Sequence, residues 1–230
     1  MLSSRLALLL FVSLPCFGAQ SAVDFAAAHF GEKLPEFVEN LRFPNHSAGS
    51  AILIKCGAMV HLSGEMEGTI CFSNDDYVIE NRIRKVIVRS TRKFRITPAT
   101  IDGERESVWF NFSVIYEQKD EIKTIEVLEN HLYDIESLGP HYTAAQRSLS
   151  KFDLKCFDPK ELPISVLANV SAEGQVAQLQ FSKDPQENQC ASEIEKIIRN
   201  SLYIPATVEG KPAASTYNEV FHHYQYDPGN

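Results

Sequence analysis

The sequence lacks the short motifs that mark most enzymes and metal sites. It has 5 cysteines among 230 residues, and no two of them have the C-x-x-C spacing of a zinc knuckle or a thioredoxin-like redox site. It contains no Gly-x-Ser-x-Gly, no His-Glu-x-x-His and no glycine-rich phosphate-binding loop. Its 7 histidines lack cysteine or carboxylate neighbours at ligand spacing. These absences predict a protein that is not an enzyme and that carries neither a metal nor another cofactor.

The chain is also poor in positive charge, with 22 Lys and Arg residues against 30 Asp and Glu residues and a net charge of -8. This balance argues against binding to nucleic acid or to an anionic membrane, because both need a basic face. One basic stretch runs from Arg82 to Arg95. We expect it to be the solvated face of a helix whose isoleucines point inward. The alternative is a surface for an acidic partner or for lipid A-like anions.

Long apolar runs are missing, apart from a short one near the start. Arg5 precedes the apolar segment Leu6–Leu14, and small residues follow it. This is the pattern of a secretory signal peptide over residues 1–21, for which cleavage after Ala19 or after Ser21 would fit. The apolar segment is too short to span a bilayer, which takes about 20 residues. We therefore expect an exported protein with no membrane span after processing.

Four cysteines remain beyond that segment, namely Cys56, Cys71, Cys156 and Cys190. An even number of cysteines in an exported chain predicts disulfides, here two of them, and the count alone leaves three pairings open.

A short internal repeat organises the rest of the chain. Pro98–Gly103 reads Pro-Ala-Thr-Ile-Asp-Gly, and Pro205–Gly210 reads Pro-Ala-Thr-Val-Glu-Gly 107 residues later. Asn111 and Asn218 stand at the same offset, each after an aromatic residue. Such self-similarity indicates a repeated structural unit.

Both copies of the hexapeptide stand in the same predicted order of elements: two strands joined by a glycine-containing turn, a helix, the hexapeptide and a last strand. In the first copy we expect strands at Ile52–Leu62, Thr69–Ser73 and Val108–Tyr116, and a helix that begins at Asn74 or Asp75. In the second copy we expect strands at Val166–Val170, Val176–Ser182 and Thr216–Tyr226, and a helix that begins at Asn188.

The predicted fold class is α+β, with two tandem two-layer β-β-α-β modules. Each module is a three-stranded antiparallel sheet plus one helix, and extra short helices lie at the N-terminus and between the modules. The expected boundaries are a signal peptide at 1–21, an N-terminal helical segment at 22–48, a first module at 49–118, a linker at 119–155 and a second module at 156–230.

Three segments outside the modules have their own predictions. Phe25–Ala28 and Leu34–Val38 are expected in short helices broken at Gly31. Ile122–Leu128 fits either a strand or a helix, and Tyr142–Leu149 is expected to be helical.

The predicted hairpins also favour one disulfide pairing. Cys56 and Cys71 fall on the two strands of the first hairpin, near enough to pair, which leaves Cys156 with Cys190. A loop of about 15 residues closed by the first bridge stabilises the fold by about 3 kcal/mol on the chain-entropy model.

This order of parts resembles the C-terminal domain of TonB-type energy transducers, with one copy over about 51–116 and a second over about 164–226. The most specific piece is Pro-Ala-x-x-Asp/Glu-Gly with an aromatic residue before it, Phe94 in the first copy and Tyr203 in the second. The cysteines of the first hairpin look like the disulfide found in one branch of that family.

The resemblance implies a periplasmic protein that binds another protein, such as a segment of an outer-membrane transporter or another envelope protein, by adding it as a strand at a sheet edge. A working transducer also has a membrane anchor and a Pro-rich span, which this sequence does not show, so a free periplasmic binder fits better. The expected edge residues are Arg105, Ser107, Trp109, Asn111, Ser113, Thr216, Asn218 and Val220. The alternative is a structural or assembly factor of the envelope that self-associates, for instance as a homodimer, and captures no peptide.

Overall fold

The computed structural model describes residues 23–43, 51–72, 77–92, 94–150, 154–156, 158 and 160–222. The expected signal peptide, the expected helix caps Asn74 and Asp75, and the last part of the final predicted strand lie outside these ranges.

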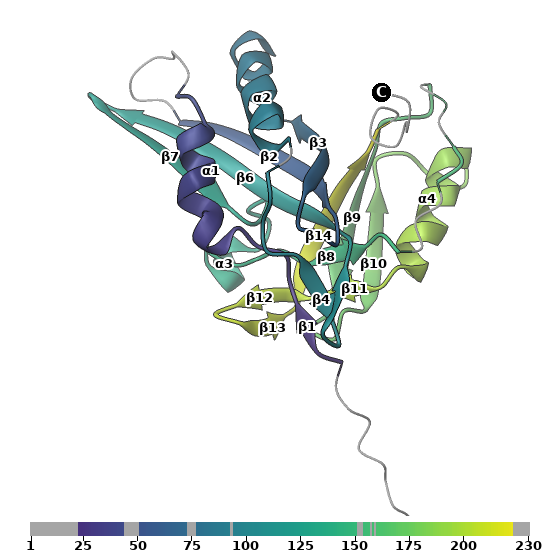
Figure 1. Cartoon of the computed structure of the whole chain (residues 1–230). Helices are drawn as coiled ribbons and strands as arrows, with labels where there is room; N and C mark the ends of the chain where they lie inside the picture. Colours follow the sequence, from purple (N-terminus) through teal and green to yellow (C-terminus); the bar gives the residue numbers. More distant parts are fainter. Residues whose placement is uncertain are drawn as a thin grey trace, which may run out of the picture.

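The fold is mixed α+β, and its sheets are antiparallel (Figure 1). The larger sheet has six strands in the order β11-β8-β6-β2-β3, with β7 also paired to β6. These strands are β2 (Ala51–Val60), β3 (Met66–Phe72), β6 (Val108–Lys119), β7 (Ile122–Leu128), β8 (Gln146–Ser148) and β11 (Tyr203–Ile204).

A smaller sheet has the strand order β10-β9-β14. Its strands are β9 (Ile164–Val170), β10 (Val176–Phe181) and β14 (Ser215–Phe221). Its helix α4 (Gln189–Asn200) lies beside it at the right of the view, whereas helix α2 (Tyr77–Thr91), which packs near β3, stands at the top (Figure 1). In the chain, α2 follows β2 and β3 and precedes β6, and α4 likewise follows β9 and β10 and precedes β14. The strands lie side by side in the corresponding orders β3-β2-β6 and β10-β9-β14.

The helix start predicted in the second half is confirmed. Asn188 is the N-cap of α4, and its side chain accepts a hydrogen bond from the Ala191 amide at 2.8 Å. That bond satisfies one of the four N–H groups that a helix leaves free at its start. Ala191, Ile194 and Ile198 form the buried face of the helix.

The repeated hexapeptides form two similar hairpins, β4 (Ala99–Ile101) with β5 (Glu104–Glu106) and β12 (Ala206–Val208) with β13 (Lys211–Ala213). Their turn residues are Asp102 and Gly103 in one hairpin and Glu209 and Gly210 in the other, all with φ between 50° and 79°. Two successive residues with positive φ are the mark of a type I′ turn, whose twist matches that of the paired strands.

A second pair of glycines has equivalent surroundings in the two halves. A Cβ added at Gly64 would lie 2.1 Å from the Ile96 carbonyl oxygen, and one added at Gly174 would lie 2.2 Å from the Tyr203 carbonyl oxygen. Each glycine therefore lets its hairpin turn touch the backbone just ahead of the local hexapeptide.

The N-terminal segment is only partly helical. Helix α1 (Leu34–Asn40) follows a 3-10 turn at Gly31–Lys33, as expected beyond Gly31. The helix expected at Phe25–Ala28 is wrong, because Phe25–Ala26 forms strand β1, which pairs with β4. A partner strand far along the chain outweighs the local helix preference of the alanines.

The segment between the predicted modules joins the larger sheet. Ile122–Leu128 is a strand, β7, which settles the alternative left open by its pattern, and it is followed by the short helix α3 (Ile135–Leu138). The helix expected at Tyr142–Leu149 is wrong, because Gln146–Ser148 forms β8, a buried strand between β6 and β11. Pairing with distant strands again overrides the local preference for a helix.

The larger sheet is buried on both faces along the first part of β6. Phe110, Phe112 and Val114 of β6 belong to a core that includes residues of α1 and α2. Trp109 of the same strand points the other way, into a core shared with α4 and β9. A Cβ at Gly57 would lie 2.4 Å from the Trp109 ring, so this strand position needs a glycine.

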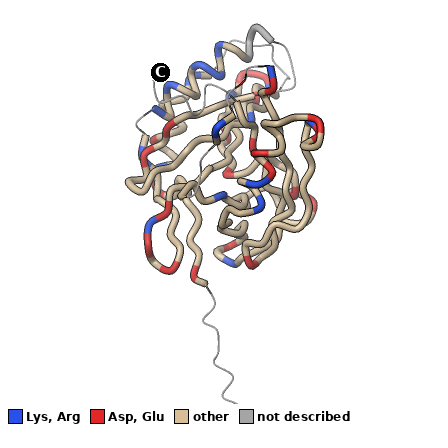
Figure 2. The backbone as a smooth tube through the Cα atoms, turned by 90° about the vertical axis from the view of Figure 1, so that its right-hand side faces the viewer, with Lys and Arg blue, Asp and Glu red and all other residues tan. Residues whose placement is uncertain are grey.

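Both expected disulfides are present, between Cys56 and Cys71 and between Cys156 and Cys190. The first joins residues directly opposite each other on β2 and β3. Within the described residues, no helix has the length and apolar character needed to cross a membrane. Acidic and basic residues are scattered over the chain trace, whereas the charged residues of α2 that the structure describes are mostly basic (Figure 2).

Candidate partner-binding edges

The first predicted edge lies inside the larger sheet. Strand β6 pairs with β2 along Val108–Glu117, and its other side pairs with β8 at Val108–Trp109 and with β7 at Ser113–Lys119. Trp109, Asn111 and Ser113 are buried. The prediction that these residues offer a free edge is therefore wrong, because the segment expected to be a linker supplies two strands that occupy it.

The two remaining residues of that prediction precede β6. Arg105 is exposed on β5, and its guanidinium donates to the Leu62 carbonyl at 3.4 Å. Ser107 is half-buried, and its carbonyl accepts from the Leu149 amide at 2.8 Å. Arg105 thus lies on the outer strand of the small β1-β4-β5 sheet, outside the strand that was predicted as the edge, and the Ser107 carbonyl is already occupied.

The second predicted edge, β14, is the outer strand of its sheet but is closed by other parts of the same chain. The amide and hydroxyl of Thr216 donate to the Asp134 carboxylate at 2.7 and 3.0 Å. The Asn218 carbonyl accepts from the Asn111 side-chain amide at 2.7 Å, and Val220 is half-buried. The two asparagines, which the repeat places at equivalent positions, thus meet each other and are not available to a partner.

A buried ion pair lies at the junction of the two sheets. The guanidinium of Arg147 on β8 donates twice to the carboxylate of Glu219 on β14, at 2.8 Å each, and both side chains are 0% exposed. Such a bidentate pair is strong and has a fixed geometry. The sequence analysis missed it; a lone acid at an inward position of the predicted strand was the available signal.

Two tyrosines complete this junction. The Tyr217 hydroxyl donates to Glu219, and the Tyr203 ring stands edge-on to the Tyr217 ring at 5.3 Å. Burial, and next the negative charge of Glu219, raise the pKa of Tyr217 well above its usual range. Tyr217 therefore remains a hydrogen-bond donor at neutral pH and helps to hold the charged pair together.

His131 is also buried near the junction. Its Nε2 lies 2.8 Å from the Cys56 carbonyl oxygen, which can only accept, so this nitrogen carries the proton. Burial is the main cause that lowers the pKa of His131 to about 4. The ring is consequently neutral at physiological pH.

The comparisons find no relative of this chain. No protein-family model, no curated protein and no solved structure matches it. The function of this chain therefore has to be inferred from its own geometry.

Strand β10 has an open edge. It pairs with β9 on one side, and the Ser182 amide bonds to the Ser165 carbonyl on that same side. Because backbone groups alternate in direction along a strand, the N–H and C=O groups of Leu179 and Phe181 point to the other side, away from β9. Within the described part of the chain, these outward groups of Leu179 and Phe181 have no hydrogen-bond partner.

Two other edge strands are less suited to pairing. On β3, the Met66 amide bonds to the Phe94 carbonyl at 2.9 Å and the Arg84 guanidinium reaches the Cys71 carbonyl at 3.5 Å. On β7, Lys123 and Glu126 are exposed. Covering groups and charges are common means of keeping an edge strand from pairing with another chain.

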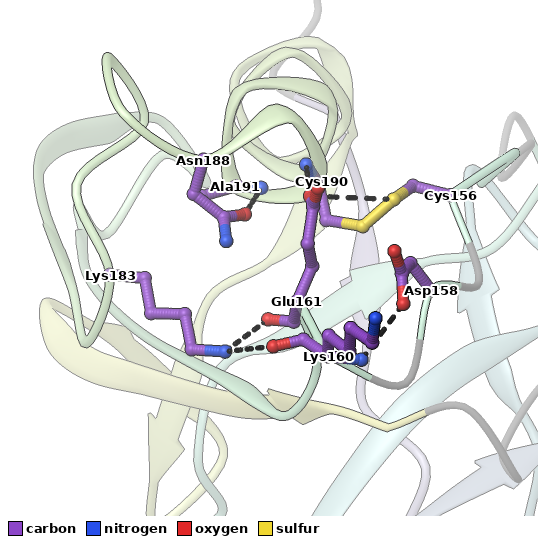
Figure 3. Close-up of a disulfide and its surroundings, with 8 residues drawn as sticks. All are labelled: Cys156, Asp158, Lys160, Glu161, Lys183, Asn188, Cys190 and Ala191. Carbon is purple, nitrogen blue, oxygen red and sulfur yellow. Dashed lines mark hydrogen bonds between the residues drawn. A yellow bond between two sulfur atoms is a disulfide. The ribbon is translucent and has the colours of Figure 1, made fainter.

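The second disulfide anchors the region beside β10 (Figure 3). Cys156, Glu161 and Cys190 lie close enough to suggest a metal site, but both sulfurs are in the bridge and cannot act as thiolate ligands. Glu161 instead accepts a hydrogen bond from the Cys190 amide at 2.8 Å, and its carbonyl accepts from Lys183, two residues after the end of β10 (Figure 3). The arrangement is structural and fixes the end of the open strand.

The buried ion pair yields a prediction on stability. Arg147→Met or Glu219→Leu alone leaves an unpaired buried charge and should lower the free energy of unfolding by about 3–5 kcal/mol. The double variant should lose clearly less than the sum of the two single losses. Urea denaturation of all four proteins measures this coupling.

The matched control is the exposed pair of Arg199 and Glu195 on α4, with N and O 2.8 Å apart. The corresponding variants there should change stability by less than about 1 kcal/mol. Additive effects at Arg147 and Glu219 would contradict the buried pairing.

His131 yields a prediction on pH. The neutral ring stabilises the fold above pH 6.5, the usual pKa in the unfolded chain, and this stability is lost as the pH falls to about 4, the folded pKa. The loss amounts to about 3 kcal/mol, because each unit of pKa difference corresponds to about 1.4 kcal/mol. Urea denaturation at pH 7.5 and at pH 4 should show that His131→Gln, which cannot titrate, loses less stability on acidification by that amount. Equal losses in the two proteins would rule out a buried neutral ring.

Proposed function

We propose that this chain is an exported protein that binds an extended segment of an envelope protein, and that the segment adds as a strand to the outer edge of β10. The observation that carries the proposal is the row of outward backbone groups at Leu179 and Phe181, which have no partner within the described residues. Backbone hydrogen bonds to such an edge supply affinity, and side chains on alternate sides supply specificity.

The composition of β10 supports this use. Its sequence, Val-Ala-Gln-Leu-Gln-Phe, contains no charged residue and no proline. Exposed edge strands normally carry such residues to prevent pairing with other chains. A register shift between Val176 and Leu179 disrupts the first part of the strand. The regular part that a partner can extend is therefore Leu179–Phe181.

The proposal includes a tandem arrangement of two β-β-α-β modules, each comparable to a TonB C-terminal domain. The shared strand order, the two type I′ hairpins and the two glycines packed against backbone support it. In this arrangement the last strand of each module, β6 or β14, is closed within the chain. The second strand of the second module, β10, takes over the role of the binding edge.

A second candidate is self-association through the same edge. Two β10 strands from two copies could pair antiparallel about a twofold axis and join their sheets. The uncharged composition of β10 permits this as well as peptide capture. Sedimentation of the chain from residue 22 onward separates the two: a monomer that binds peptide supports capture, and a stable dimer that binds none supports self-association.

The test of strand addition uses peptides selected from a random display library on the chain from residue 22 onward, with its disulfides formed. Leu179→Pro removes an outward N–H and should reduce binding of the selected peptides at least tenfold, which corresponds to about 1.4 kcal/mol. Lys123→Pro on β7 is the matched control, because it removes an N–H from another sheet edge. Calorimetry measures the affinities, and thermal unfolding checks that both variants fold.

Two results would contradict the proposal. One is that folded Leu179→Pro binds the peptides as well as the parent chain does. The other is that the control on β7 loses binding equally, since the selected peptides would then depend on a different surface or on global stability.

A further inference from the structure

Helix α2 and Arg92, the residue directly after its end at Thr91, carry a stripe of positive charge. Arg82, Lys85, Arg89 and Arg92 are exposed and follow one another at spacings of three, four and three residues. On an α-helix these spacings place side chains along one face. The buried residues Ile83, Ile87 and Thr91 lie on the opposite face. At 1.5 Å per residue the stripe is about 15 Å long.

The charges of this stripe are not used within the described structure. No ion pair between described residues involves Arg82, Lys85, Arg89 or Arg92. Arg84, which is half-buried between them, behaves differently: its guanidinium donates to Asn81 and to the Cys71 carbonyl. Among the described contacts, Arg84 thus bonds within the fold, whereas the side chains of the stripe are exposed to solvent.

The equivalent helix of the other half provides an internal comparison. Helix α4 has two acidic and two basic residues, Glu193, Glu195, Lys196 and Arg199, and it pairs Arg199 with Glu195. A helix in this position of the sheet therefore does not need a positive face in order to fold. The stripe on α2 is a separate feature that calls for an external anion.

The surroundings of the stripe are rich in hydrogen-bond donors. Arg89 and Arg92 line two neighbouring clefts, one with Arg42, Asn40 and Ser90 and the other with Arg84, Lys85 and Asn81. No Asp or Glu lines either cleft among the described residues. Guanidinium groups match the oxygens of phosphate in shape and charge.

We infer that the exposed face of α2 docks on a membrane surface whose headgroups carry anionic phosphate. A stripe on the outer side of the molecule can place all four cations against a flat anionic surface at once (Figure 2). Among the side chains described from residue 81 onward, this face bears no large apolar anchor of the kind that the centre of a protein–protein interface contains, since Val86 and Val88 beside the stripe are half-buried. The attraction is electrostatic.

The charge distribution would fix the orientation of the docked molecule, because the overall acidic balance leaves this stripe as the basic face. The chain has a net charge of -8, so the remainder of the molecule is repelled by an anionic membrane while the stripe is attracted. The protein would therefore lie with α2 toward the membrane and with β10 free, because α2 packs against β3 of the larger sheet whereas β10 belongs to the smaller sheet (Figure 1).

The experiment is co-sedimentation of the chain from residue 22 onward with vesicles of 30% phosphatidylglycerol in phosphatidylcholine, and with pure phosphatidylcholine vesicles. We expect binding to the anionic vesicles alone, weakened by added salt because salt screens exposed charges. Each cation near an anionic surface strengthens binding about fivefold, so Arg89→Gln/Arg92→Gln should bind about 30-fold more weakly. The control Lys119→Gln/Lys211→Gln removes the same charge from exposed positions outside α2 and should bind nearly as well as the parent chain.

Three outcomes would overturn the inference. They are equal binding to the two kinds of vesicle, equal weakening in the two double variants, and binding of poly-glutamate without binding of anionic vesicles, which would assign the stripe to an acidic protein. Loss of vesicle binding on addition of inorganic phosphate at constant ionic strength would indicate a discrete phosphate pocket in place of a membrane surface. The test does not involve β10, so its failure leaves the proposed peptide capture untouched.

Discussion

The contact between Arg147 and Glu219 determines how the two halves of this molecule fit together. Two charges with no exposure to solvent are stable only when paired, so β8 of the larger sheet must lie against β14 of the smaller one. Once these strands meet, the Asn111 side chain reaches the Asn218 carbonyl and Asp134 reaches Thr216. These two contacts close the edge that a single module of this kind would leave open.

Closure of β14 shifts the available edge to the far side of the smaller sheet. Strand β10 is held at its end by the hydrogen bond from Lys183 to Glu161 and by the nearby disulfide, and it presents its outer backbone groups without charges beside them. A rigid edge loses little conformational entropy when a strand adds to it. Within the described residues, the smaller sheet thus presents an edge that suits the proposed partner, and α2 presents a cationic face that suits the proposed anionic surface.

The sequence predicted those features that depend on neighbouring residues. The Asp-Gly and Glu-Gly turns, the strands beside them and the Asn188 helix cap have local physical causes, and the structure contains them. It did not predict pairings between distant segments, which made a strand of Phe25–Ala26 and of Gln146–Ser148. The mistaken edge at β6 had a visible warning, because a nearly continuous apolar run such as Val-Trp-Phe-Asn-Phe-Ser-Val-Ile-Tyr is typical of a strand buried on both faces.

Amide hydrogen exchange followed by NMR tests the central claim most directly, because it distinguishes the closed edge of the smaller sheet from its open edge residue by residue. The account predicts slow exchange for the Thr216 amide, which donates to Asp134, and rapid exchange for the Leu179 and Phe181 amides, which face solvent. Rapid exchange at Thr216 together with slow exchange at Leu179 and Phe181 would contradict it, since β14 would then be the open edge and β10 the closed one.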